Sequence, residues 1–256
     1  MTTEPHVLIT GAGKRIGRAI ALDLGLRGWK VSVHYGNSAQ DAEEVVEEIN
    51  RRAGGLKRAA SHQADLSREK ETSQLVTACA KALGPLTALI NNASTFNDDS
   101  LEEMTRASWD HHIETNLRAP LVLAQAFANQ LPKEAHGSIV NIIDQRVWRL
   151  TPKFFTYTIS KAALWTATQT MAQALGPRIR VNGVGPGPTL QATHQDPDTF
   201  AKQQRATILE LGSTPEDISA AVRYLLAAPA VTGQMIAVDG GQHLAWRTPD
   251  ADGALE

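Results

Sequence analysis

Short runs of β-branched and other apolar residues alternate along the chain with longer segments whose apolar residues recur every three or four positions. The short runs predict strands and the longer segments predict helices. We expect strands at residues 6–10, 30–35, 59–63, 88–91, 138–143, 179–183 and 235–238. We expect helices at residues 16–27, 39–52, 68–83, 109–131, 155–175 and 215–227. This alternation is typical of parallel strands joined by helical crossovers, so the predicted fold class is α/β, with about seven strands in one doubly wound sheet covered on both faces.

One segment breaks the alternation. Residues 185–212 begin with a Pro/Gly cluster and continue through a polar stretch into a short helical pattern. Insertions that follow a strand end often form lids, so a substrate loop or lid is predicted there. No linker or internal repeat divides the rest, which predicts a single domain over residues 1–256 with a flexible tail at 248–256.

Composition narrows the class of protein. The 256 residues are 42% hydrophobic and 20% charged, with a formal net charge of −2. Such a chain has no overall field to attract nucleic acid or an anionic membrane. Neither a signal peptide nor an apolar stretch of about 20 residues is present, so a cytoplasmic location is expected. Cys79 is the sole cysteine and is expected to be a buried structural residue.

A glycine-rich loop follows the first predicted strand and leads into the first helix. It contains Gly11, Lys14, Arg15, Ile16 and Gly17. Glycines in this position allow a pyrophosphate to approach the backbone, where free N–H groups and the helix dipole stabilise its charge. The position between strand and helix predicts a dinucleotide site on a Rossmann-type domain, whereas the glycines alone would be weak evidence.

The end of the second strand indicates which dinucleotide binds. NAD sites usually carry a carboxylate there, which binds the ribose hydroxyls. This chain instead has His34, Tyr35, Asn37 and Ser38, with Lys14 expected nearby. These donors suit a 2′-phosphate, so NADP (NADPH) is the predicted cofactor. Alternatively, these residues only cap the next helix, as Ser38 is placed to do.

Tyr157 and Lys161 lie four residues apart in the predicted helix 155–175 and therefore share one face. A nearby ammonium is expected to favour the phenolate and to lower the pKa of the tyrosine. The pair by itself occurs often by chance. Its context with the glycine-rich loop makes a catalytic pair the better interpretation.

Together these motifs resemble the short-chain dehydrogenase/reductase family, over residues 7–241. The resemblance implies cofactor contacts from Asp65, Leu66, Asn92, Ala93, Ser94, Lys161, Pro186 and Gly187, in addition to the phosphate-loop residues. It implies that Asn116 holds a water in a proton relay through Lys161 to Tyr157. It also implies a homotetramer.

Two departures from the general family pattern indicate a subgroup. Arg15 replaces the second glycine of the loop, and Asp144 stands thirteen residues before Tyr157, where the family has a catalytic serine. These two residues, with Phe96, resemble the pteridine reductases, including bacterial dihydromonapterin and dihydrofolate reductases of this fold. The resemblance implies that Phe96 stacks on a pterin ring and that Arg15, Asp144 and Tyr157 contact this small-molecule substrate.

The chemistry of the substitution is consistent with that subgroup. Reduction of a C=N bond requires a proton at a ring nitrogen, and a carboxyl group whose pKa is raised by burial can supply it. The predicted catalytic residues are therefore Asp144, Tyr157, Lys161 and Asn116. No metal site is predicted, because His111 and His112 lack ligand-like spacing and are expected at the surface or at a helix start.

Several alternatives remain open at this stage. Asp144 can be read as a strand-end cap or a partner of Arg146, and Phe96 as a residue packed under its own loop. The enzyme can be an NADP-dependent carbonyl or alcohol oxidoreductase of the same family, or the fold can serve a non-catalytic dinucleotide-binding protein. Trp148, Phe154 and Phe155 are expected to form pocket walls. The sequence does not say which pterin or folate is the substrate.

Overall fold

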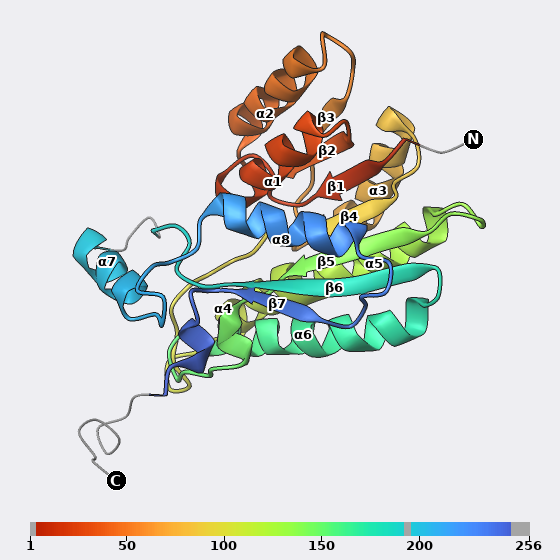
Figure 1. Cartoon of the computed structure of the whole chain (residues 1–256). Coiled ribbons are helices and arrows are strands. Elements are labelled where there is room, and N and C mark those ends of the chain that lie inside the picture. Colours follow the sequence, from red (N-terminus) through yellow and green to blue (C-terminus); the bar gives the residue numbers. More distant parts are fainter. Residues whose placement is uncertain (1–3, 192–195, 247–256) are drawn as a thin grey trace, which may run out of the picture.

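The protein is described by a computed structural model over residues 4–191 and 196–246, and these residues form one seven-stranded parallel sheet (Figure 1). The strands lie in the order β3-β2-β1-β4-β5-β6-β7. Their bounds are β1 (His6–Ile9), β2 (Lys30–Tyr35), β3 (Ala59–Gln63), β4 (Ala88–Asn91), β5 (Gly137–Ile142), β6 (Ile179–Pro186) and β7 (Met235–Val238). The predicted fold class is confirmed, and β2, β3, β4 and β7 have the predicted bounds.

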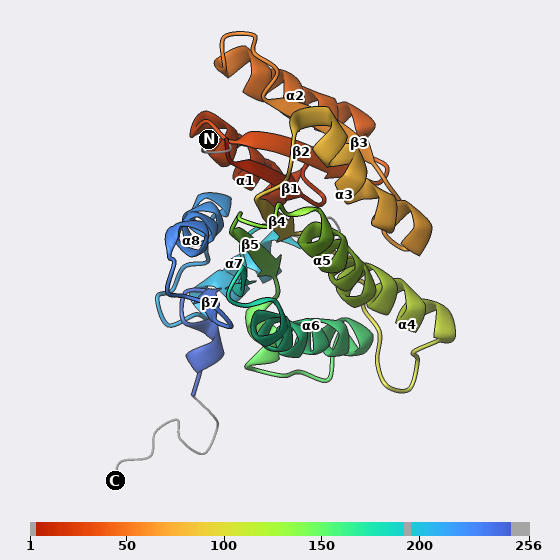
Figure 2. The same cartoon turned by 90° about the vertical axis from the view of Figure 1, so that its right-hand side faces the viewer.

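Helices cover both faces of the sheet. Figure 2 shows α1 and α8 on one side and α3, α5 and α6 on the other. The bounds of the helices are α1 (Arg15–Leu26), α2 (Ala39–Arg52), α3 (Glu69–Leu83), α4 (Arg106–Ile113), α5 (Ala119–Gln130), α6 (Phe155–Leu175), α7 (Pro197–Arg205) and α8 (Pro215–Ala227). α8 begins with a capping box in which Thr214 and Asp217 exchange hydrogen bonds, and Pro215 occupies the first helical position.

The core consists of two main apolar clusters, one on each side of the sheet. In β1, Val7 and Ile9 pack with α1, α2 and α8, whereas Leu8 packs with α3 and α5. All three side chains are fully buried. Strands covered on both faces need continuous apolar runs, which explains why the sequence pattern of β1 does not alternate.

The helix predicted at residues 109–131 is present, but it contains a turn that the sequence pattern did not indicate. α4 continues into a π-helical turn at Glu114–Arg118, which continues into α5. Such turns insert an extra residue into a helix and often occur at functional sites. Apolar periodicity continues across the turn, so the sequence pattern did not reveal it.

The segment after β6 combines strand, loop and helix. β6 runs three residues further than expected, to Pro186, and the predicted short helix is α7. Figure 1 shows α7 projecting beside the edge of the sheet at which β6 ends. The tail predicted at 248–256 lies outside the described residues, as do residues 192–195. In the described chain, no helix combines the length and apolarity required to span a membrane.

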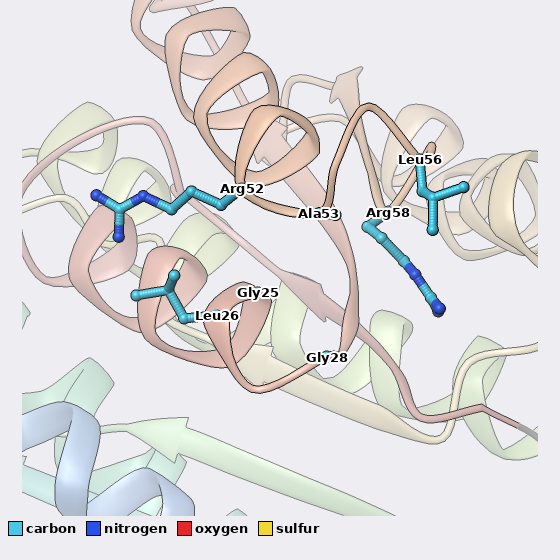
Figure 3. Close-up of a pocket in the computed structure, with 7 residues that line it drawn as sticks. All are labelled: Gly25, Leu26, Gly28, Arg52, Ala53, Leu56 and Arg58. Carbon is cyan, nitrogen blue, oxygen red and sulfur yellow. The ribbon is translucent and has the colours of Figure 1, made fainter.

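A hollow of about 250 Å³ lies near the end of α1, at the edge of the sheet where β2 begins (Figure 3). Its two cations, Arg52 and Arg58, extend in different directions. Both are paired with acids, Arg52 with Glu48 and Arg58 with Glu4. This hollow is remote from the carboxyl ends of the strands, and its arginine charges are already balanced.

Buried His6 makes the stability of the fold sensitive to acid. Its Nδ1 lies 2.7 Å from the Gly84 carbonyl and its Nε2 lies 3.0 Å from Ser32 Oγ. Desolvation lowers the pKa of His6 to about 4. Because the unfolded chain binds this proton more readily, the contribution of neutral His6 is complete above about pH 6.5 and is lost as the pH falls toward 4.

We expect His6→Gln to flatten the dependence of the free energy of unfolding on pH between 4 and 6.5, by on the order of 2 kcal/mol over this window. Urea unfolding at several pH values measures the slope. His111→Gln is the matched control, since the same substitution is then made at an exposed position. Equal slopes in wild type and His6→Gln would contradict the role of His6.

Candidate active site

The predicted site residues gather at the carboxyl edge of the sheet. β1 and β4 are neighbours there, and the chain order of the strands reverses between them. In doubly wound sheets, ligands bind in the crevice at this switch point. The loops that follow β1, β4, β5 and β6 carry most of the residues expected from the sequence.

The phosphate loop turns tightly because its glycines leave room for the backbone. Gly11 has φ +62°. A Cβ on Gly17 would lie 2.2 Å from the Gly11 carbonyl oxygen and 2.6 Å from Asn92 Nδ2. Lys14 is the N-cap of α1, and Arg15 follows as the first helical residue. The loop therefore presents the amino end of α1 at the switch point, where an anion would be stabilised.

The loop after β4 is bound to the phosphate loop. Asn92 Nδ2 donates to the carbonyls of Thr10 and Gly11 at 2.8 and 3.1 Å, and the Ala93 N–H donates to Thr10 Oγ1 at 2.9 Å. Two segments that the sequence assigned to the cofactor are thus held together as one surface.

His34 lies beneath this surface, with 2% of its area exposed. Its Nδ1 accepts a hydrogen bond from the Gly11 N–H at 3.1 Å, and its Nε2 donates to the Ala64 carbonyl at 3.1 Å. Desolvation lowers the pKa of His34 to about 4, so the ring is neutral. The expectation of direct phosphate contact is therefore corrected: His34 braces the loop from below, and both of its nitrogens are bound within the protein.

The other predicted NADP-phosphate residues lie at the surface above the end of β2. Tyr35 is partly buried, Asn37 is exposed and Ser38 is the N-cap of α2 without a side-chain cap bond. Lys14 Nζ lies 3.0 Å from Asp41 Oδ2. Lys14 thus comes close to this segment as expected, but its charge is shared with an acid from α2.

The segments after β3 and β6, which are also predicted to contact the cofactor, are held by local contacts. Asp65 accepts from the N–H and hydroxyl of Ser67, and Leu66 is buried. After β6, Gly187 packs so closely on Asp239 that a Cβ would lie 2.6 Å from its Cα. This close packing explains why a glycine follows Pro186.

The structure brings Asp144 and Tyr157 into direct contact. Asp144 follows β5, and Tyr157 is in the first turn of α6. The Tyr157 hydroxyl donates to Asp144 Oδ2 at 2.9 Å. Asp144 Oδ1 accepts from the Arg146 N–H at 2.7 Å, so the alternative of a strand-end cap is also realised. One carboxylate oxygen caps the turn and the other faces the tyrosine.

Lys161 lies on the same face of α6 as Tyr157, as predicted. Its Nζ donates to the Ile142 carbonyl at 2.9 Å and lies 5.8 Å from the centroid of the Tyr157 ring. Only 2% of Lys161 and 6% of Tyr157 are exposed. The pair is therefore a buried constellation rather than a solvated helix face.

Burial dominates the ionisation of these groups. Desolvation, with a further contribution from the charge of Asp144, raises the pKa of Tyr157 well above 10. The expectation that Lys161 lowers this pKa is therefore wrong, because desolvation dominates. Desolvation also raises the pKa of Asp144 and lowers that of Lys161 to about 8. The tyrosine is held as a neutral proton donor beside a carboxyl group that binds protons more readily than usual.

Asn116 lies in the π-helical turn and is fully buried. Its Oδ1 accepts from the Thr95 N–H and the Ser94 hydroxyl, and its Nδ2 donates to the Thr95 carbonyl and to Ser160 Oγ. Asn116 thus joins the loop after β4 to α6. This position is compatible with the implied proton relay, in which Asn116 stays a prediction.

Phe96 lies next to Tyr157 and Phe154. Its ring is stacked on Phe154, with centroids 4.3 Å apart and planes 8° apart, and it meets Tyr157 edge-on at 4.7 Å. The Arg146 guanidinium lies 5.0 Å from the Phe154 centroid and 5.8 Å from that of Phe96. Phe96 is 44% exposed, so packing under its own loop is not its role here.

The aromatic residues that were expected to form the pocket wall have different neighbours. Trp148 is 43% exposed and contacts Trp165 and His243, while Phe155 is partly buried. Only Phe154 is stacked on Phe96. Trp148 follows the short 3₁₀ turn at Gln145–Val147 and packs toward His243, so its role as a pocket wall stays a prediction.

Arg15 reaches across from the phosphate loop. Its φ is +53°, a left-handed value that is unusual for a non-glycine residue. Its guanidinium donates to the carbonyls of Leu190 and Gln191 at 3.1 and 2.9 Å. The predicted cofactor loop and the predicted substrate loop are therefore connected by this side chain.

The sequence interpretation missed one buried residue. His111 is exposed as expected, but His112 is fully buried and the surface prediction for it is wrong. It binds Thr156 and the Asn97 N–H, next to Tyr157 and Phe96. Its position four residues before Asn116, and so on the same side of a helix, was the signal available. Within the described ranges, no group of three His, Cys, Asp or Glu side chains is placed to hold a metal ion.

Known proteins resemble this chain over most of its length. A family model described as "Enoyl-(Acyl carrier protein) reductase" matches residues 11–243. A short-chain type dehydrogenase/reductase of Picea abies is 32% identical over 92% of this chain and 91% of its own. The 3-oxoacyl-[acyl-carrier-protein] reductase FabG of Staphylococcus epidermidis is 33% identical over 93% of this chain and 98% of its own.

Two solved structures are more similar in sequence. Both are of FolM alternative dihydrofolate reductase 1 in complex with NADP. The Brucella canis protein is 44% identical with a TM-score of 0.90, covering 96% of this chain and 97% of its own. The Brucella suis protein is 45% identical with a TM-score of 0.93, covering 98% of this chain and 99% of its own.

The packing of Gly17 predicts a selective loss of cofactor binding. We expect Gly17→Ala to raise the dissociation constant for NADPH at least about tenfold, because its Cβ must displace the Gly11 backbone. Fluorescence titration measures this constant. Gly25→Ala is the control in the same helix, since its Cβ meets the Ile49 side chain at 2.8 Å. The control should lose stability but keep its NADPH affinity, and equal affinities in both variants would exclude the proposed loop geometry.

Proposed function

Because this chain belongs to the short-chain dehydrogenase/reductase family, we propose that it is an NADPH-dependent reductase of a pterin-type substrate: a dihydropterin, dihydromonapterin or dihydrofolate. The observation that carries this proposal is the hydrogen bond from the Tyr157 hydroxyl to the Asp144 carboxylate. It places a carboxyl group where other family members are expected to have a serine. The two Brucella reductases give independent support.

The residues at the switch point fit a dinucleotide phosphate. The backbone at Gly11 and Gly17 is too tightly packed to admit a side chain, and the first N–H groups of α1 have no acceptor within the helix, so an anion can bind at this helix end. No carboxylate ends β2, and Lys14 and Ser38 are proposed as the donors to a 2′-phosphate. NADPH, when bound, supplies the hydride. The protein residues bind it, orient it and deliver the proton.

The proton is proposed to come from the Tyr157 and Asp144 pair. Reduction of a C=N bond adds a hydride to carbon and a proton to nitrogen. Tyr157 keeps its proton at neutral pH because its pKa is raised, and Asp144 can return a proton to it because the pKa of the carboxyl is also raised. The Lys161 ammonium, bound to the Ile142 carbonyl, is proposed to hold the nicotinamide ribose and to complete the relay with Asn116.

Substrate is proposed to bind beside Phe96 and the catalytic pair. One face of Phe96 is stacked on Phe154, and 44% of the residue is exposed, so part of the ring surface is available to a flat heterocycle. Arg15 is proposed to contact the same substrate from the phosphate loop. A cytoplasmic location and a homotetramer belong to the same proposal, and a light-scattering mass of one chain would exclude the tetramer.

The acid group can be tested by Asp144→Ser. We expect this variant to lose dihydrobiopterin, dihydromonapterin and dihydrofolate reduction by at least about 100-fold in kcat/KM, because general acid catalysis contributes this much. NADPH affinity should be retained. Preserved turnover of all three substrates would refute the role of Asp144. Efficient ketone reduction by the wild type, with no reduction of the three pterin-type substrates, would favour the alternative of a carbonyl oxidoreductase.

Tyr157→Phe separates an enzyme from a binding protein. The phenyl ring keeps the packing around α6 but cannot donate a proton, so turnover should be lost while the NADPH dissociation constant stays within about twofold. Stopped-flow absorbance of NADPH measures turnover. If neither wild type nor variant oxidises NADPH with any pterin or ketone, the alternative of a non-catalytic dinucleotide-binding protein is favoured.

The cofactor preference follows from the end of β2. We expect kcat/KM at limiting cofactor to be at least about tenfold higher for NADPH than for NADH, since charge-assisted bonds to a 2′-phosphate are strong. Lys14→Ala should reduce this ratio, whereas exposed Lys57→Ala, far along the chain from the loop, should not. Equal or better use of NADH by the wild type would reject the preference.

A further inference from the structure

A chain of hydrogen bonds connects the Phe96 loop, residues 94–101, with the first turn of α6. The Asn97 N–H donates to His112 Nε2 at 3.2 Å, and His112 Nδ1 lies 2.7 Å from Thr156 Oγ1. The Thr156 hydroxyl in turn donates to Asp99 Oδ2. His112 and Thr156 are both 0% exposed. This series of hydrogen bonds therefore passes through the protein interior and connects Asn97 with Asp99, two residues of the same loop.

The direction of every bond in this chain is determined by its ends. A backbone N–H can only donate, so His112 Nε2 must carry the lone pair and its proton must be on Nδ1. Nδ1–H then donates to Thr156 Oγ1, which leaves the hydroxyl proton for the Asp99 carboxylate. Desolvation lowers the pKa of His112 against the opposing charge of Asp99. The neutral ring that the chain requires is therefore the favoured form.

The chain ends beside two groups of the proposed pterin site. Asn97 follows Phe96 in sequence, and Thr156 precedes Tyr157. Phe96 is 44% exposed, so Phe154 and Tyr157 contact only part of its ring, and the backbone of the loop also contributes to its position. Yet Phe96 meets the Tyr157 ring at 4.7 Å with an interplanar angle of 78°.

The same loop also caps α6. The Phe154 N–H donates to Asp98 Oδ1 at 3.2 Å, and the Thr156 N–H donates to Asp99 Oδ1 at 3.0 Å. The Phe155 N–H donates to the Asp99 carbonyl at 3.1 Å. The caps fix residues 98 and 99 of the loop, and the bond to His112 fixes residue 97, next to the aromatic ring.

We propose that His112 and Thr156 are positioning residues of the substrate site, which hold Phe96 in its place beside Tyr157, where a flat heterocycle would bind. This inference rests on the proposed pterin-reductase function for the identity of the ligand. Neither residue touches substrate. They act through Asn97 and Asp99 of the Phe96 loop, to which their side chains are hydrogen-bonded.

Thr156→Val and Thr156→Ser form the matched pair that tests this proposal. Valine has the shape of threonine but no hydroxyl, so it removes the links to His112 and Asp99, whereas serine keeps them. We expect Thr156→Val to raise KM for the dihydropterin about tenfold, with kcat and the NADPH dissociation constant changed less than about threefold. Thr156→Ser should stay within about twofold of wild type in all three. Equal KM values in the two variants, or a parallel loss of NADPH affinity, would overturn the proposal.

Hydrogen exchange provides a readout that does not depend on the substrate. The Asn97 amide should be protected in wild type and Thr156→Ser, and should exchange about tenfold faster in Thr156→Val. His112→Asn is a second variant, since its amide reaches Thr156 but is too short for the Asn97 N–H, and it should release this amide as well. Unchanged protection in both variants would overturn the positioning chain. If hydrogen exchange confirms the hydrogen bonds through His112 and Thr156 but the wild type reduces no dihydropterin, the proposed function is wrong. The conclusion that these residues position the Phe96 loop is then retained.

Discussion

The hydrogen bond between Tyr157 and Asp144 is the interaction on which the site depends, since it joins the end of a central strand to the start of the longest helix. A carboxyl group and a phenol removed from water need partners, because an unpaired buried polar group is costly. Each supplies the other. The caps at the start of α6 position Tyr157, and the turn after β5 positions Asp144. Together they determine the geometry of this hydrogen bond.

The sheet makes that contact possible. Parallel strands end at one edge, and the order of β1, β4, β5 and β6 places their loops side by side there. β5 and β4 are buried along their whole length, so the ends of these strands have little freedom to move. The resulting division is clear: the apolar interior fixes the strand ends, and polar bonds between loops then fix the side chains that bind and react.

The sequence predicted the fold well because its strands are short apolar runs and its helices have a regular period. The phosphate loop and the pair Tyr157 and Lys161 were found because glycine geometry and helical spacing have direct physical meaning. His34 and His112 were misplaced for a common reason: both are polar residues whose hydrogen-bond partners lie distant in sequence, and neither periodicity nor spacing reveals such partners. The π-helical turn at Asn116 was hidden because an extra residue in a helix changes no residue type. The predicted direction of the Tyr157 pKa shift was wrong because the shift is dominated by desolvation, and the burial of a side chain cannot be read from helical spacing.

The carboxylates of Asp98 and Asp99 also bear on the protonation of Tyr157. The amino end of a helix carries partial positive charge, and this charge would stabilise a phenolate on a tyrosine in the first turn. Here two acids from the Phe96 loop occupy that end of α6 and offset the charge. Tyr157 therefore lacks one of the influences that would favour its ionised form. The loop that carries Phe96 thus also helps to keep Tyr157 in the protonated state from which it can donate.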